Sequence, residues 1–165
     1  MLPISTATNT AGTPIPVPGG VELTMAITPN GKTLYVAHIN YGGGGVTPVI
    51  LATRKAGNFI PTGSVWTLAI TPNGKTLYVG TSPKVIPIST TTNSVGKAIK
   101  LGSYGFATSI AFTPDGTMAY VASVGSAVLP IRIATNTALR LIRVGTNPDA
   151  ITSMPTLASP CHLCY

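Results

Sequence analysis

The sequence is short of acidic and other titratable side chains. Of its 165 residues, three are acidic and two are histidine, against ten lysines and arginines, which gives a formal net charge of +7. So few acids and histidines leave little material for catalysis by paired carboxylates or by a histidine-centred triad. Cysteine is also scarce, and both residues, Cys161 and Cys164, lie among the last five positions. A disulfide through the core is therefore excluded, and cysteine usage does not indicate the cellular compartment.

Long segments of one character are missing as well. No apolar run approaches the ~18 residues of a membrane-spanning helix, and the first residues lack the basic and apolar regions of a signal peptide. The longest basic run is the pair Arg54 and Lys55, whereas nucleic-acid-binding proteins usually gather basic and aromatic residues into a patch. We therefore expect no membrane span and no nucleic-acid partner. At 44% hydrophobic, the chain is too apolar for disorder.

The sequence contains a clear internal repeat. The segment Ala-Ile-Thr-Pro-Asn-Gly-Lys-Thr-Leu-Tyr-Val at 26–36 recurs unchanged at 69–79 and in a divergent form at 111–121, so that the copies begin 43 and then 42 residues apart. A second motif, built around Thr-Asn, accompanies them at 2–10, 86–94 and 129–137. A period of about 40–45 residues is typical of the blades of a β-propeller.

Each unit predicts four short antiparallel strands, which we letter A to D from the innermost outwards. The Thr-Leu-Tyr-Val segments have the β-branched and aromatic composition of strands, and we expect them to be buried as strand B. Thr-Pro-Asn-Gly supplies the turn between strands A and B, because proline presets its own φ and glycine tolerates a positive one. We therefore expect Gly31, Gly74 and Gly116 to have positive φ.

At these residues the sequence resembles the YVTN-type β-propeller repeat family, whose blades carry an Ile-Thr-Pro-Asp/Asn-Gly-Lys-Thr-Leu-Tyr-Val core and a Thr-Ala-Thr-Asn turn. The resemblance covers about residues 2–155. It implies wedge-shaped blades suited to rings of about seven, and a parent protein on or outside the cell envelope of bacteria or archaea. Many members of this family have no assigned activity.

The repeat is cut within its blades. We divide the chain into a half-blade at 1–20, whole blades at 21–63, 64–104 and 105–146, a second half-blade at 147–155 and an irregular tail at 156–165. The first half-blade matches strands C and D, and the second matches strand A. Two copies could exchange these halves to form an eight-bladed homodimer, or one chain could close as a four-bladed ring. We favour the homodimer, because wedge-shaped blades adapt more easily to eight than to four and because free strand edges promote association.

Two groups of loop residues are candidates for binding a small molecule or a polymer. Between strands B and C of the first whole blade, His38, Asn40 and Tyr41 precede a run of four glycines, which is either a binding loop or a flexible segment that nothing contacts. The loops that lead into strand A contribute aromatic and acidic side chains, which either line the mouth of the channel or pack between blades and cap loop amides. These residues are Glu22, Trp66, Tyr104 and Asp149.

The tail offers Cys161, His162 and Cys164 as zinc ligands. One Cys-x-x-Cys without a second pair is weak evidence, and we favour the interpretation of this segment as an accidental frayed tail. The composition therefore favours a non-catalytic propeller scaffold that serves as a structural or ligand-binding module and needs no cofactor. The alternative is a weak ester or phosphoester hydrolase, metal-assisted or not, with its site on the channel face.

Overall fold

Antiparallel hairpins account for nearly all the regular structure of the computed structural model, which describes residues 1–18, 20–40, 43–102, 105–153 and 163–164. A 3-10 turn at Ile133–Thr135 is the one helical element within these ranges. None of the described helices is long and apolar enough to cross a membrane. The predicted all-β class is confirmed.

Three antiparallel sheets, each four strands deep, follow one another along the chain, and we call them blades 1, 2 and 3. In blades 1 and 3 the outermost strand is split into two short pieces that pair with the same third strand. Blade 1 contains β3 (Val21–Ile27), β4 (Thr33–Asn40), β5 (Gly43–Ile50), β6 (Lys55–Ala56) and β7 (Ile60–Pro61). Blade 2 contains β8 (Val65–Ile70), β9 (Thr76–Thr81), β10 (Lys84–Ser89) and β11 (Ile99–Lys100). Blade 3 contains β12 (Ala107–Phe112), β13 (Met118–Ser123), β14 (Ala127–Arg132), β15 (Thr137–Ala138) and β16 (Ile142–Arg143).

Two further strand pairs flank the blades. β1 (Ile4–Ser5) pairs with β2 (Thr10–Ala11), and β17 (Thr152–Ser153) pairs with β18 (Leu163–Cys164). We call them the N-terminal and C-terminal half-blades. The strand β18 falls in the segment predicted to be an irregular tail, where it takes the place of the beginning of a strand B.

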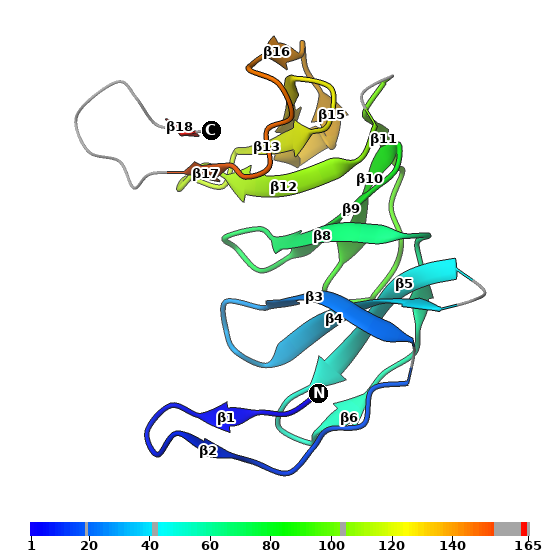
Figure 1. Cartoon of the computed structure of the whole chain (residues 1–165), viewed down its shortest axis with the longest axis vertical. Helices are drawn as coiled ribbons and strands as arrows, with labels where there is room; N and C mark the ends of the chain where they lie inside the picture. The colour runs from blue at the N-terminus through cyan, green and yellow to red at the C-terminus, as the bar shows by residue number, and fades with distance from the viewer. Residues whose placement is uncertain (19, 41–42, 103–104, 154–162, 165) are drawn as a thin grey trace.

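The blades are arranged around their innermost strands. β3 lies against β8, β8 against β12, and β12 against β17. Figure 1 shows the resulting open arc, with the N-terminal half-blade at the bottom and the C-terminal half-blade at the upper left. Within the described residues, β1 is paired with β2 alone and β18 with β17 alone. One chain therefore carries both half-blades, at opposite ends of the arc.

The turn between strands A and B has the same structure in all three blades. In blade 1 the Thr28 hydroxyl donates to the side chain of Asn30 at 2.8 Å and accepts from the amide of Thr33 at 3.1 Å. The same contacts recur from Thr71 and Thr113. The glycine that follows has a φ of 67°, 71° and 67° in blades 1, 2 and 3. The positive φ predicted for Gly31, Gly74 and Gly116 is confirmed.

Apolar side chains from facing blades form the core. The strand-B residues Tyr35, Ala37, Leu77 and Val79 are all completely buried in one cluster between blades 1 and 2. A second cluster, which includes Tyr78 and Val121, joins blades 2 and 3. Strands that are covered on both faces read as continuous apolar runs, which explains why every residue of Leu-Tyr-Val is buried in blades 1 and 2.

Candidate functional site

The glycine run of blade 1 is part of a sheet. β4 and β5 pair as far as Asn40 opposite Gly43, so the extra residues lengthen strands B and C. A Cβ on Gly44 would lie 2.6 Å from the carbonyl oxygen of Gly63, and one on Gly45 would overlap the ring of Phe59. The prediction of a loop, whether binding or free of contacts, is therefore wrong for residues 43–45. Glycine is needed there because the outer part of the blade lies directly against the strand.

His38 lies within β4 and is buried. Its side chain is 1% exposed and stacks on Phe59, with ring centroids 5.1 Å apart and planes inclined by 18°. Neither ring nitrogen has a hydrogen-bond partner within the described residues. Blades 2 and 3 carry Thr81 and Ser123 at the corresponding position, and the Thr81 hydroxyl donates to the carbonyl oxygen of Lys84 at 2.8 Å. Blade 1 alone of the three therefore places an imidazole here.

Thr47 adds a second buried polar group on the same face of blade 1. It is 1% exposed, and its hydroxyl has no partner in the part of the chain that the structure describes. Thr47 lies two residues after Gly45, which pairs with His38 across the two strands. The side chains of Thr47 and His38 therefore lie on the same face of the sheet. Blades 2 and 3 have the apolar Ile86 and Leu129 at this register position. Sequence analysis missed Thr47, although comparing the three repeats position by position would have found it.

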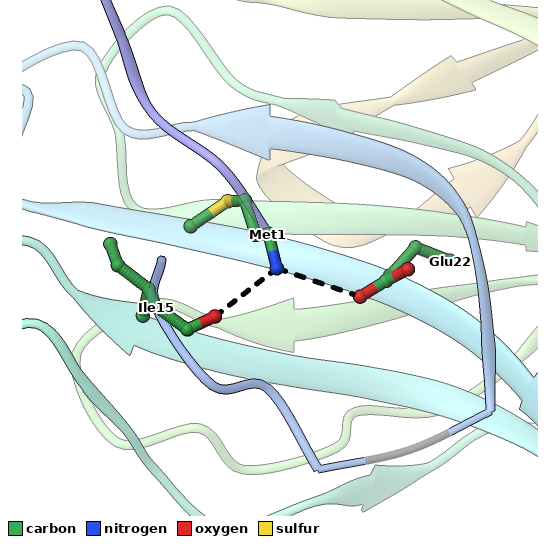
Figure 2. A network of polar contacts seen from close by, with 3 residues as sticks. All are labelled: Met1, Ile15 and Glu22. Carbon is green, nitrogen blue, oxygen red and sulfur yellow. Dashed lines mark hydrogen bonds and ion pairs between the residues drawn. The ribbon is translucent and has the colours of Figure 1, made fainter. Parts of the chain in front are cut away.

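Glu22 joins this face from the neighbouring strand. It stands opposite His38 in the pairing of β3 with β4, so the structure brings together two of the predicted site residues. Its side chain is 46% exposed, and one carboxylate oxygen lies 3.9 Å from the amino group of Met1. That amino group also donates to the carbonyl oxygen of Ile15 at 3.1 Å, as Figure 2 shows. An ion pair this exposed contributes little to stability, but it ties the N-terminal half-blade to blade 1.

Trp66 forms a half-exposed aromatic platform with Phe106. Their rings stack with centroids 4.2 Å apart and planes inclined by 19°, and the indole is 52% exposed. Trp66 belongs to the first strand of blade 2, and Phe106 directly precedes that of blade 3. The predicted packing of Trp66 between blades is therefore seen for one face of the ring, while about half of the residue remains accessible.

A β-bulge explains why Trp66 is accessible. In each whole blade the register of strands A and B shifts once near the start of strand A, between Glu22 and Thr24, Val65 and Thr67, and Ala107 and Ser109. A bulge redirects the extra side chain away from the ladder. The residues at these three positions are Leu23, Trp66 and Thr108. The bulges therefore place equivalent side chains of successive blades along one edge of the inner strands.

The other predicted site residues are not part of this arrangement. Asp149 is exposed next to Pro148, whose carbonyl oxygen accepts a 2.7 Å hydrogen bond from Thr108, so it lies at the blade 3 end of the arc, away from Glu22. Tyr41, Tyr104, Cys161 and His162 lie outside the described residues, and only the backbone is described at Asn40 and Cys164. Among the described residues, no group of three or more His, Cys, Asp and Glu side chains could hold a metal ion.

The buried imidazole and the aromatic platform differ in their access to solvent. The imidazole is 1% exposed, and no described acidic side chain hydrogen-bonds to it. The Trp66–Phe106 platform, by contrast, offers a flat apolar surface next to the ends of the inner strands. A hollow of about 540 Å³ lies elsewhere, between the strand A to strand B turns of blades 2 and 3, and its lining includes Asn73, Met118 and Arg132.

Comparison with known proteins shows the fold. No family model and no curated protein matches the chain. Among solved structures, the Kuenenia stuttgartiensis hydrazine synthase is 26% identical with a TM-score of 0.74, over 87% of this chain and 42% of that one. Two further matches, U3-55K and the WD40 repeats of RRP9, have TM-scores of 0.74 at 15% and 16% identity, and each covers 84% of this chain. The chain spans less than half the length of each of these proteins, and its fold is that of a β-propeller.

Proposed function

We propose that the protein is a non-catalytic β-propeller scaffold that binds a ligand at the edge formed by the starts of its inner strands. The observation that carries this proposal is the half-exposed stack of Trp66 on Phe106. A large aromatic platform held between two blades is typical of a surface that receives a flat apolar face, such as that of a sugar ring. The WD40-type neighbours support an interaction module on the same fold.

The tryptophan makes this proposal directly testable, because it is the only one in the chain. We expect a saturable change in its fluorescence on titration with cellohexaose or chitohexaose. Phe106→Leu, which removes the stacking partner and keeps the indole, should weaken the response at least several-fold. Unchanged emission with both oligosaccharides would overturn the sugar-binding form of the proposal.

The hydrolase alternative has less support, because His38 is buried and no described acid hydrogen-bonds to it. We expect p-nitrophenyl acetate and p-nitrophenyl phosphate to be turned over no faster by the protein than by its His38→Thr variant. Turnover that this substitution abolishes would favour the hydrolase instead.

We further propose that two copies form a homodimer with an eight-bladed ring. The half-blades at the ends of the arc support this, since their strand edges are unpaired within the described residues and such edges favour association. Membership of the YVTN-type family and an origin at the cell envelope remain proposals that rest on the sequence motifs.

A further inference from the structure

A hydrogen bond links each whole blade to the next, and we call it the latch. The Tyr35 hydroxyl of blade 1 donates to the side-chain oxygen of Asn93 in blade 2 at 2.8 Å, and that of Tyr78 donates to Asn136 in blade 3 at 2.5 Å. In both cases donor and acceptor are 58 residues apart. The tyrosine comes from strand B, and the asparagine from the turn that follows strand C of the next blade. The latch is therefore a property of the repeat.

Each end of the arc holds one unused half of a latch. Tyr120 is the strand-B tyrosine of blade 3, and its hydroxyl has no hydrogen-bond partner among the described residues. Asn9 lies in the turn after β1, with a φ of 51° that matches the 58° and 50° of Asn93 and Asn136. The turn is thus already in the conformation that accepts a latch. Figure 1 places β13, which carries Tyr120, and the β1–β2 hairpin at opposite ends of the arc.

Blade 1 also exposes an apolar face towards the side where a preceding blade would pack. Met25 and Ile27 of β3 are 53% and 51% exposed. The corresponding residues of blade 2, Leu68 and Ile70, pack against the core cluster shared with blade 1. Those of blade 3, Ile110 and Phe112, pack in the same way against the cluster shared with blade 2. The face of β3 is therefore built to be covered by a first and second strand.

We propose that a second copy of this chain supplies these missing pieces, so that Tyr120 of one protomer latches onto the partner's Asn9. This inference rests on the homodimer proposed above and specifies how it is joined. The C-terminal half-blade of one chain and the N-terminal half-blade of the other form one composite blade, and the two-fold axis generates two of them. Strands β17 and β18 then cover Met25 and Ile27 of the partner.

The strand register of the composite blade follows from the repeat. In blade 2, Leu77 stands opposite Ile70 on one side and opposite Ile88 on the other. In the C-terminal half-blade, Leu163 stands opposite Ser153, which occupies the position of Ile70. Ile4 occupies the position of Ile88, two periods earlier. The backbone of Leu163 should therefore lie opposite that of the partner's Ile4.

A double-mutant cycle on the whole chain tests the latch. Tyr120→Phe removes the donor, and Asn9→Gly removes the acceptor while tolerating the positive φ. Because the dimer contains the bond twice and one net hydrogen bond is worth a factor of about 5.5, each change should lower the equilibrium constant for forming the folded dimer about thirtyfold. If the two groups contact each other, the double variant should lose no more than either single variant. Urea unfolding at matched concentrations measures these constants, and light scattering gives the mass.

Tyr78→Phe is the matched control, because it removes a latch within one chain. In the double variant Tyr78→Phe/Asn9→Gly the two losses should multiply, so that the equilibrium constant for forming the folded dimer falls about a thousandfold. If the double variant Tyr120→Phe/Asn9→Gly is still a dimer but its loss equals the product of the two single losses, the latch is overturned and the homodimer is not. A light-scattering mass of one chain would overturn both the homodimer and the latch between protomers. If Tyr120→Phe and Asn9→Gly were still coupled in such a monomer, the latch would lie within a four-bladed ring.

Discussion

At the scale of single residues, polar side chains at equivalent positions of the repeat make equivalent hydrogen bonds in successive blades. Tyr35 and Tyr78 are completely buried and bond to equivalent asparagines. Burial raises the pKa of Tyr35, and it raises the pKa of Tyr78 to about 12. His38 and Thr47 depart from this regularity, because they are buried without a described partner on the face of blade 1 that is turned towards the N-terminal half-blade.

The raised pKa of Tyr78 predicts a loss of stability in alkali. Between pH 10, where the unfolded tyrosine deprotonates, and pH 12, where the folded one does, only the folded state retains the proton. The free energy of unfolding should therefore fall with pH over this window, by about 2–3 kcal/mol from this group. Urea unfolding from pH 9 to pH 12 should show the advantage of the native chain over Tyr78→Phe shrinking above pH 10. Parallel curves for the two proteins would contradict the assignment.

At Thr47 we predict a substitution that increases the stability of the protein. Thr47→Val keeps the shape of the side chain and removes a buried hydroxyl that has no described partner, so we expect it to stabilise the protein by about 1 kcal/mol. Thr81→Val is the control, because the Thr81 hydroxyl is equally buried but donates to Lys84. It should destabilise by about 1 kcal/mol. A loss of stability in Thr47→Val would show instead that the hydroxyl is bound by a water or a ligand.

At the scale of elements, local chemistry explains what the sequence could predict. The Thr-Pro-Asn-Gly turn contains its own hydrogen bonds within six residues, so its structure was predicted down to the sign of φ at Gly31. The latch was not predicted, because it joins residues 58 positions apart whose proximity depends on how blades pack. The glycine run was predicted as a loop because its close contact with Gly63 and Phe59 comes from the outer part of the blade.

The turn gives a prediction that isolates backbone conformation. A Cβ on Gly31 would meet nothing within 4 Å, but its φ is 67°. Gly31→Ala should therefore cost about 1 kcal/mol through the unfavourable φ alone. Gly145→Ala, which also meets nothing within 4 Å and has no positive φ, should change stability by less than ~0.5 kcal/mol. Equal effects of the two substitutions in thermal unfolding would contradict this account of the turn.

At the scale of the whole molecule, the blades form an arc whose two ends are complementary. One end offers strands C and D of a blade, an acceptor turn at Asn9 and the uncovered face of β3. The other end offers the beginning of strands A and B and a donor at Tyr120. The internal repeat suggested this division, and the strand β18 at the position of a strand B is the structural feature that supports it. In the proposed homodimer, folding and association should be one process, as in obligate dimers.

The most direct test of this account is the mass of the purified protein by multi-angle light scattering, together with its thermal stability over a hundredfold range of concentration. The homodimer predicts twice the chain mass of 16.8 kDa and a melting temperature that rises with concentration. A mass of one chain, with a melting temperature independent of concentration, would contradict the homodimer.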